Sequence, residues 1–252
     1  MSRKSALLVA AVAAAVWLMP LQAHAVLSLA GDASGSNFCA ADQNVGCGFG
    51  IVLSDSNPVV NTLALGSTGS ALVIDGLSIM GSVSTAIFGV INILDSSSLS
   101  ITNISSAPVT THWTVSATGF VPPVATSFLS GSGTWVTAAG STITLTWFND
   151  PANRQGAGTS TDRPGTLLAT FSDVANGFAD SFSFSSIVPV SDPAPFSMTM
   201  GFDLTLVPGG SLISRGQTEI KPQGTAVPEP STLVLVGLGL GLIGLRRRQP
   251  VR

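Results

Sequence analysis

Few side chains in this sequence are suited to acid–base or nucleophilic catalysis. Beyond residue 25 the chain has one histidine, His112, which stands between Thr111 and Trp113. A Ser-His-Asp triad needs such a histidine, but no G-x-S-x-G elbow precedes a helical segment here. We therefore interpret His112 as a strand histidine satisfied by neighbouring polar groups. A hydrolase that uses His112 is the alternative.

The carboxylates give no better catalytic pair. Glycoside hydrolysis requires two carboxylates, and one of them is usually a glutamate. The two glutamates, Glu219 and Glu229, both lie near the C-terminus. Asp150, Asp162 and Asp173 could converge in space, but turns and strand ends take aspartate for conformational reasons. We expect no catalytic residues and no enzyme activity, with an Asp pair as the alternative for a hydrolase.

Metal ligands are equally scarce. One histidine and a cysteine pair separated by seven residues cannot form a zinc site, so we predict no metal ligands and no cofactor. Calcium is left open by two groups of oxygen ligands, although the EF-hand spacing is absent. The groups are Asp32, Asn37, Asp42 and Asn44 in one segment, and Asp150 with Asn153 in another.

Tryptophan is the residue type that could stack on sugar rings. Trp113 and Trp147 fall in phase with apolar neighbours, which predicts that both are in the core. Trp135 is flanked by Val136, which competes for the buried face. Trp135 is therefore the candidate glycan contact. It would act with loop residues near 150–162 if the chain is a carbohydrate-binding module.

The elements that must position these residues are β-strands. Ser, Thr, Val and Gly are abundant, and helix formers such as Glu and Lys are rare. Apolar residues alternate with small or polar ones over 196–206, which is typical of a half-buried antiparallel strand. Turn-forming segments at 95–98, 122–123, 131–133, 139–141, 149–151 and 191–193 separate such runs. The pattern predicts an all-β fold, an antiparallel β-sandwich of the jelly-roll or Ig-like kind.

Three further segments complete this outline. Residues 71–93 are apolar with weak periodicity, and we predict two or three strands there rather than a helix. Residues 153–164 contain Gly, Thr and Arg and are predicted to form an exposed loop. Residues 216–226 are polar and contain proline, which predicts a stalk after a β domain of residues 26–215.

The charge of the exported part excludes one class of partner. Residues 26–230 carry 4 basic and 13 acidic side chains, which is a net charge of −9. Such a surface repels phosphate backbones, so we expect no nucleic acid partner.

The N-terminus has the three parts of a secretory signal peptide over residues 1–25. Arg3 and Lys4 form the basic region, an apolar segment follows, and Ala23-His24-Ala25 is an A-x-A cleavage site. We expect the Sec machinery to export the chain and cleavage to occur after Ala25. An exported chain with two cysteines, Cys39 and Cys47, predicts a disulfide that closes a small loop.

The C-terminus, residues 227–252, contains a short motif, an apolar run and a basic end. The motif is Val227-Pro228-Glu229-Pro230, whose prolines prevent a helix. Residues 231–245 carry no charge and would span about 22 Å as a helix, against a hydrocarbon core of about 30 Å. Arg246, Arg247 and Arg248 would stop this transmembrane helix on the cytoplasmic side.

These three parts, in this order, resemble the PEP-CTERM sorting signal. The resemblance implies an exported protein of a Gram-negative bacterium that makes exopolysaccharide. It implies processing by an exosortase, a membrane peptidase, after transient anchoring in the inner membrane. The cell surface or the extracellular matrix would be the destination, with exopolysaccharide as a partner.

Taken together, the sequence predicts a non-catalytic surface or biofilm-matrix protein sorted through its PEP motif. A carbohydrate-binding module of the matrix is the first alternative, and a secreted hydrolase is the second.

Overall fold

The computed structural model describes residues 25–34, 36–41, 51–54, 62–65, 70–88, 91–121, 124–192 and 194–221. In these residues the chain forms strands and no helix. The strands are β1 (Val26–Ala33), β2 (Ser36–Ala41), β3 (Ile51–Ser54), β4 (Thr62–Leu65), β5 (Leu72–Ile74), β6 (Leu77–Phe88), β7 (Ile91–Asn103), β8 (Val109–Phe120), β9 (Val124–Val136), β10 (Thr142–Asp150), β11 (Thr166–Val174), β12 (Ala179–Asp192), β13 (Phe196–Leu206) and β14 (Ser211–Lys221).

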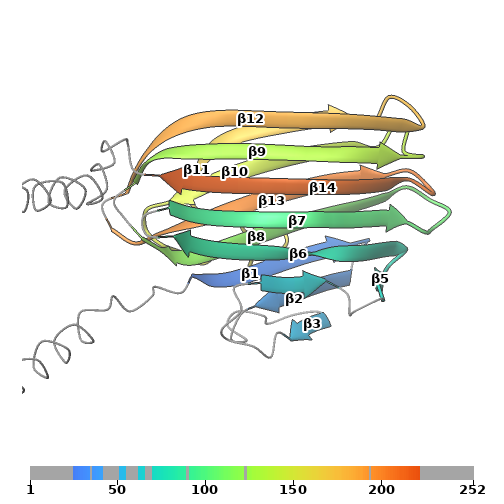
Figure 1. Ribbon diagram of the computed structural model, residues 1–252. Helices are drawn as coiled ribbons and strands as arrows, with labels where there is room; N and C mark the ends of the chain where they lie inside the picture. Colours follow the sequence, from blue (N-terminus) through green and yellow to red (C-terminus); the bar gives the residue numbers. More distant parts are fainter. Residues whose placement is uncertain are drawn as a thin grey trace, which may run out of the picture.

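The strands form two sheets packed face to face (Figure 1). Sheet A has the order β11-β10-β13-β8-β1-β2-β3, and sheet B has the order β12-β9-β14-β7-β6-β4, with β5 paired to β6. Neighbours are antiparallel except β2 and β3, which are parallel. The predicted all-β sandwich is therefore confirmed. The predicted strands in 71–93 are also found, as β5, β6 and the start of β7.

From β7 to β14 the chain pairs in a nested order. In sheet B, β7 pairs with β14 and β9 with β12. In sheet A, β8 pairs with β13 and β10 with β11. The first half of this segment thus folds back along the second half, and the chain crosses between the sheets at almost every connection. Residues distant in sequence are brought side by side by this arrangement.

The core lies between the sheets and is built from alternate residues of each strand. Its largest fully buried side chains include Trp113 of β8, Trp135 of β9 and Trp147 of β10. Two glycines of β9 make room for core side chains of other strands. A Cβ at Gly131 would lie 2.6 Å from Leu145, and one at Gly133 would lie 2.4 Å from Phe182. The turn predicted at 131–133 is therefore wrong, because these glycines serve packing inside β9.

The outer face of sheet A is covered by the connection between β10 and β11, residues 151–165. For this reason β13 is buried along almost its whole length rather than on one face only. The connection is a loop, as predicted, but it is not simply exposed. Gly156 and Ala157 are buried, and so is Ser160. The loop prediction is corrected in this respect, because polar contacts to the sheet hold these residues down.

The end of the domain lies further along the chain than predicted. β14 continues to Lys221, and Ile220 is fully buried. Residues 216–221 are thus part of sheet B, and the predicted stalk over 216–226 is wrong for these six positions. Buried and outward-facing residues alternate along β14. The outward-facing residues after position 215 are polar, and this polarity is typical of a linker as well.

The predicted targeting segments lie outside the described residues. Ala25 precedes β1 and is buried, whereas Ala23 is not described. The sorting motif, the apolar segment 231–245 and the arginines that follow are not described either. In the part of the chain that is described, no helix is long and apolar enough to span a membrane.

Candidate functional site

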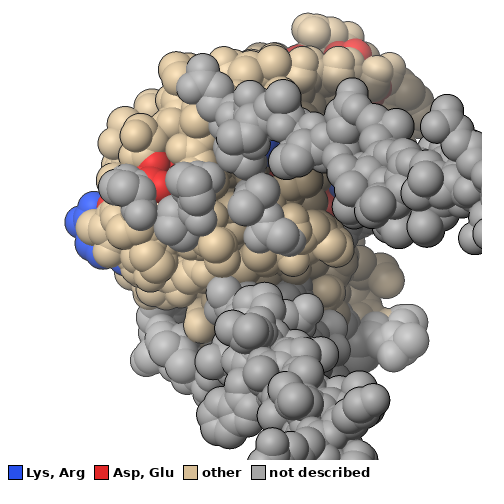
Figure 2. Space-filling model, turned by 60° about the vertical axis from the view of Figure 1, so that its left-hand side comes forward, with Lys and Arg blue, Asp and Glu red and all other residues tan. Residues whose placement is uncertain are grey.

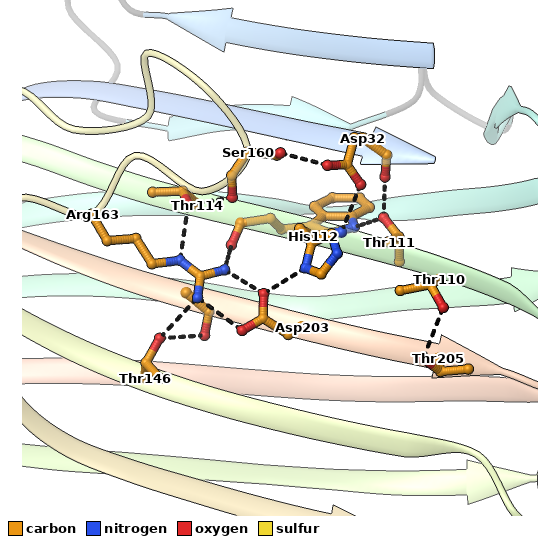
Figure 3. A network of polar contacts seen from close by, with 12 residues as sticks. Asp32, Thr110, Thr111, His112, Thr114, Thr146, Ser160, Arg163, Asp203 and Thr205 are labelled. Atoms are coloured by element: carbon orange, nitrogen blue, oxygen red, sulfur yellow. Dashed lines mark hydrogen bonds and ion pairs between the residues drawn. The ribbon is translucent and has the colours of Figure 1, made fainter. Parts of the chain in front are cut away.

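The densest group of polar side chains lies on the outer face of sheet A, beneath the loop 151–165. Figure 3 shows side chains from β1, β8, β13 and the loop pointing toward one another. Arg163 and Ser160 come from the loop, His112 from β8, Asp203 from β13 and Asp32 from β1. We call this group the sheet A network.

Arg163 is the centre of the sheet A network. Its guanidinium binds Asp203 through both ends, with Nη2–Oδ1 at 2.6 Å and Nη1–Oδ2 at 2.8 Å. Nε also donates to the Thr114 hydroxyl at 3.2 Å, and Nη2 donates to the Trp113 carbonyl at 3.2 Å. The Arg163 side chain is only 12% exposed. A bidentate, charge-assisted contact of this kind fixes both position and orientation.

The sheet provides a space for this guanidinium. A Cβ at Gly201 of β13 would lie 2.3 Å from Cζ of Arg163. Any side chain larger than hydrogen would therefore force the guanidinium to shift from its present position. The glycine explains how an arginine side chain lies flat across two strands.

Asp203 also accepts a hydrogen bond from Nδ1 of His112 at 2.8 Å. Burial acts to raise the pKa of Asp203, but the hydrogen bonds from Arg163 and His112 outweigh it and lower the pKa below its ordinary value. Asp203 is therefore a carboxylate held ionised by two donors. The His112 side chain is 39% exposed. It is a strand histidine with a polar partner, as predicted.

A second set of contacts ties the loop to β1 and β8. Ser160 donates its hydroxyl to Oδ2 of Asp32, and the His112 backbone N–H donates to Oδ1 of Asp32 at 2.9 Å. The Thr114 hydroxyl donates to the Ser160 carbonyl at 2.6 Å. The loop is thus fastened through both side-chain and backbone groups.

The sheet A network does not form a Ser-His-Asp relay. Such a relay needs a hydroxyl that is hydrogen-bonded to the histidine ring. The hydroxyl of Ser160 donates to Asp32 instead, and in the described residues the His112 ring has Asp203 as its hydrogen-bonding partner. The arrangement stabilises the loop and holds no activated nucleophile.

The predicted glycan contact at Trp135 is wrong. Trp135 is fully buried, packs near Phe182 and donates Nε1–H to Oδ2 of Asp173 at 2.7 Å. Trp135 faces the core because β9 places positions 129, 131, 133 and 135 inward. Val136 is the exposed neighbour, at 38%. The core positions predicted for Trp113 and Trp147 are confirmed.

The three aspartates considered for a hydrolase each have separate partners. Asp150 accepts from the Arg154 side chain and from the backbone N–H groups of Ala152 and Arg154. Asp162 accepts from the Gly158 N–H, and Asp173 accepts from Trp135. Burial tends to raise the pKa of Asp150, but these hydrogen bonds lower it overall. Each carboxylate therefore stabilises a turn or a neighbouring side chain.

The two calcium candidates are only partly described. Asp32 lies opposite Asn37 in the β1–β2 register, but both carboxylate oxygens of Asp32 accept hydrogen bonds from the protein. Asp42 and Asn44 lie outside the described residues. Asn153 accepts from the Gly119 N–H. Within the described part of the chain no three His, Cys, Asp or Glu residues are grouped to hold a metal ion.

The predicted disulfide has one described end. Cys39 is buried in β2 and is a disulfide cysteine, not a free thiol. Cys47 lies outside the described residues, so the Cys39–Cys47 bond itself is not seen and stays a prediction.

A shallow cavity of about 340 Å³ lies on the outer face of sheet B. Its lining includes the hydroxyl residues Ser132, Thr134 and Ser181, together with Ile213 and Arg215. Arg215 pairs with Asp95 through Nη2–Oδ2 at 2.9 Å, and its side chain is 55% exposed. Sequence reasoning missed this cavity, because neighbouring hydroxyls on different strands give no local signal.

The scarcity of basic residues is a sequence signal that could have identified the arginines of both outer faces as structural residues. The described residues contain four basic side chains besides His112, and every one forms an ion pair. The pairs are Arg154–Asp150, Arg163–Asp203, Arg215–Asp95 and Lys221–Glu219. In a chain with so few cations, each has many carboxylates available as partners. Which partner each one takes depends on the fold.

Comparison with solved structures gives distant similarities to carbohydrate-binding modules. They include TmCBM61 in complex with β-1,4-galactotriose (9% identity, 55% of this chain and 86% of that chain, TM-score 0.32). Another is the C-terminal CBM6 of LamC from Zobellia galactanivorans (16%, 64% and 100%, 0.26). A third is CBM6cm-2 from Cellvibrio mixtus lichenase 5A in complex with cellotriose (13%, 63% and 97%, 0.25). At these TM-scores we draw no conclusion about a ligand. No curated protein matches the chain.

The C-terminus gives a specific result. The family model of the PEP-CTERM protein-sorting motif matches residues 226–248. The match includes the predicted motif 227–230 and the three arginines 246–248, which confirms the resemblance. Such a motif implies processing by an exosortase and export to the cell surface. The chain is therefore a protein that carries a PEP-CTERM protein-sorting motif at its C-terminus.

Proposed function

We propose that this protein is a non-catalytic component of the cell surface or of an exopolysaccharide matrix. The sorting motif at residues 226–248 is the observation that carries the proposal. The β-sandwich would be the part that is delivered, and its role would be structural or adhesive. Figure 2 is consistent with this role, because most of the described surface on that face carries no acidic or basic side chain.

The sheet A network supports the absence of catalysis. A catalytic acid or base must be able to exchange a proton with a substrate. Here Asp203 is held by Arg163 and His112, and Asp32 is held by Ser160 and a backbone N–H. The groups that resemble catalytic residues thus bind one another and hold a loop.

The nested strand order supports a jelly-roll form of the sandwich over an Ig-like form. A jelly roll has eight strands in two Greek keys. Strands β7–β14 pair as first with last, second with seventh, third with sixth and fourth with fifth. The strands β1–β6 would then be additions at one side of the jelly roll.

Export would use both ends of the chain. The signal peptide of residues 1–25 would direct the chain to the Sec machinery and be removed after Ala25. The apolar segment 231–245 would anchor the chain in the inner membrane, with the arginines 246–248 on the cytoplasmic side. An exosortase would then act near the motif 227–230 and release the sandwich.

Substitution of the motif glutamate tests the sorting proposal. Wild type and Glu229→Ala are compared in the native host by cell fractionation and intact mass. We expect wild type outside the cell, without residues 1–25 and without the segment after Pro230, and Glu229→Ala in the membrane at higher mass. Glu219→Ala is the control, because it removes a carboxylate from β14 and leaves the motif intact. If wild type keeps its tail and stays in the inner membrane, the segment is only an anchor and the proposal fails.

A second candidate function is saccharide binding by the cavity on sheet B. The observation that favours it is a lining of hydroxyls next to an exposed arginine and the apolar Ile213. Hydroxyls and guanidinium groups can hydrogen-bond the edges of a sugar, and an aliphatic side chain can contact its C–H face. This cavity replaces Trp135 as the candidate contact.

Filling the cavity tests the second candidate. Ser181→Trp places a large side chain at its margin, and Ser191→Trp places the same side chain on β12 outside it. Native gels containing a soluble exopolysaccharide measure binding as retardation. We expect wild type and Ser191→Trp to be retarded and Ser181→Trp to migrate freely. Equal migration of all three in gels with and without polysaccharide would exclude the cavity as a saccharide site.

A further inference from the structure

The margin of sheet B formed by β12 is open. On one side β12 pairs with β9 along almost its whole length. On the other side no described strand pairs with it, and in Figure 1 β12 is the outermost strand of its sheet. An edge strand presents a row of backbone donors and acceptors to any other extended chain.

Pro189 identifies the residues whose backbone groups face the open side. Proline has no N–H, so within a strand it occupies positions whose N–H would face away from the neighbour. The register between β12 and β9 is continuous from Ala179 to Pro189. Backbone direction alternates along a strand, so Ser181, Ser183, Ser185 and Ile187 share the orientation of Pro189. Their N–H and C=O groups therefore face the open edge, where the N–H of Ser181 is taken by Oδ1 of Asp180.

The usual protections of an edge strand lie at the two ends of β12. At its start, the charged Asp180 accepts a hydrogen bond from the Ser181 N–H at 2.8 Å. Natural edges are blocked by charged side chains, proline or bulges. Pro189 and the register shift between Pro189 and Asp192 protect the last residues. Residues 181–188 contain no charged side chain and no proline. Ile187, which is 66% exposed, lies in this unprotected part.

We infer that residues 183–187 of β12 form an assembly surface and that its partner is β12 of a second copy of this chain. Antiparallel pairing of two such edges would satisfy the free backbone groups of both. The edge is self-complementary because it is uncharged and rich in serine. Hydroxyl pairs across antiparallel strands already occur inside this fold, as between Thr110 and Thr205 and between Thr144 and Ser172. Sheet B would continue from one copy into the next.

Site-specific cross-linking tests this assembly in the full-length chain. Ser183→Cys, Ser185→Cys and Ile187→Cys are expressed separately in the native host and oxidised. Directly opposed residues of an antiparallel pair have Cβ atoms about 4.5–5.5 Å apart, which is near the distance a disulfide requires. We expect at least one variant to give a disulfide-linked band of twice the chain mass. Ser132→Cys, on the outer face of β9, is the control and should stay monomeric.

Two edge variants show whether strand pairing causes the cross-link. Ser185→Pro removes an N–H that faces the open edge, and Ser183→Lys adds a charge that would lie near its copy. Each substitution is combined with the cysteine variant that cross-links best, at a different position of β12. Each double variant should lose the dimer band, and the thermal unfolding of its monomer should stay unchanged. Ser186→Pro is the matched control for folding, because the N–H of Ser186 faces β9 and its loss should destabilise the sandwich.

Three results would overturn the inference. The first is the absence of a dimer band at every edge position, and the second is a band of equal intensity with Ser132→Cys. The third is a cross-linked product whose mass is not twice that of the chain, which would identify a different partner. The assembly does not depend on the sorting proposal, so Glu229→Ala is expected to keep the cross-link even if it stays in the membrane.

Discussion

The outer faces of the two sheets use similar residues in different ways. On sheet A, the loop 151–165 covers the strands, and Arg163 lies between loop and sheet, bound to Asp203. On sheet B no described segment covers the corresponding strands, and Arg215, which pairs with the mostly buried Asp95, has a side chain that is 55% exposed. The Arg–Asp pair on sheet A fastens a loop to the strands, whereas the pair on sheet B joins two neighbouring strands and fastens no loop. The difference indicates that burial of the arginine, rather than residue type, decides what such a pair contributes.

The comparison predicts unequal losses when each arginine is removed. Arg163→Ala leaves the partly buried Asp203 without its main partner, and we expect a loss of about 3 kcal/mol in the free energy of unfolding. Arg215→Ala removes an arginine that is 55% exposed, where water can take the place of the guanidinium at Asp95, and should cost less than about 1 kcal/mol. Urea unfolding followed by tryptophan fluorescence measures both. Equal losses would contradict the assignment of Arg163 as the residue that fastens the loop.

Gly201 sharpens the comparison by changing the space available to Arg163 without changing any charge. Gly201→Ala brings a Cβ against the guanidinium, and overpacking of this kind costs about 1–3 kcal/mol. The loop should then be cleaved faster by trypsin after Arg154, because Arg163 is followed by Pro164 and is not a cleavage site. Gly177→Ala is the control, because the nearest atom to its added Cβ is 4.0 Å away. An unchanged cleavage rate in Gly201→Ala would show that the guanidinium can shift without releasing the loop.

Acid should weaken the fastening of the loop on sheet A. The pKa of Asp203 is lowered in the folded protein, so its contribution is complete above the unfolded pKa, which is about 3.9. That contribution is lost as pH falls through the lower folded pKa. The difference in unfolding free energy between wild type and Asp203→Asn should therefore shrink as pH falls below about 4. A difference that stays constant from pH 7 to pH 3 would argue against an ionised Asp203.

The smallest predicted effect lies where the two sheets meet, at Asn149 of β10 and Asp192 of β12. Nδ2 of Asn149 donates to Oδ2 of Asp192 at 2.9 Å, but the Oδ1 atoms of both side chains are buried and have no hydrogen-bond partner among the described residues. Burial raises the pKa of Asp192, the hydrogen bond from Asn149 opposes this rise, and the charge of Asp150 adds to it. An amide at position 192 could accept from Asn149 and also donate to its free oxygen.

Asp192→Asn should therefore stabilise the protein at pH 7 by about 1 kcal/mol. A raised folded pKa means that protonation of Asp192 favours the folded state at low pH and that this contribution is lost as pH rises through the folded pKa. The advantage of Asp192→Asn should accordingly disappear at low pH, where the protonated acid can make the same pair. Urea unfolding of wild type and Asp192→Asn at pH 7 and at low pH measures the difference in unfolding free energy. Destabilisation at pH 7 would show that the two side chains cannot form the second hydrogen bond.

Much of the fold could be predicted because a strand gives a local pattern of alternating apolar and polar residues in the sequence. The alternation over 196–206 predicted β13, and the apolar residues of 71–93 predicted several strands. The errors occur where local signals have two meanings. Gly131 and Gly133 indicate a turn by type, but they lie inside β9, where Leu145 and Phe182 occupy the space that a side chain would need. Polar residues after position 215 indicate a linker, but they form the outward side of β14.

Less of the candidate site could be predicted. His112 was expected to have a polar neighbour, but nothing near it in sequence indicates Asp203 or Arg163. Trp135 was assigned to the wrong face, because in a strand a shift of one residue exchanges the buried and exposed sides. Only the register of β9 with β12 and β14 fixes which side is which.

The sequence by itself determined the sorting motif and the β-rich character of this protein. Both are encoded by neighbouring residues, through a short motif and a period of two. The tertiary structure decided which face is covered, where Arg163 binds and which edge is left open. Those outcomes depend on contacts between residues up to 128 positions apart, such as Ser160 with Asp32. Local periodicity specifies neither the register nor the order of strands that brings such residues together.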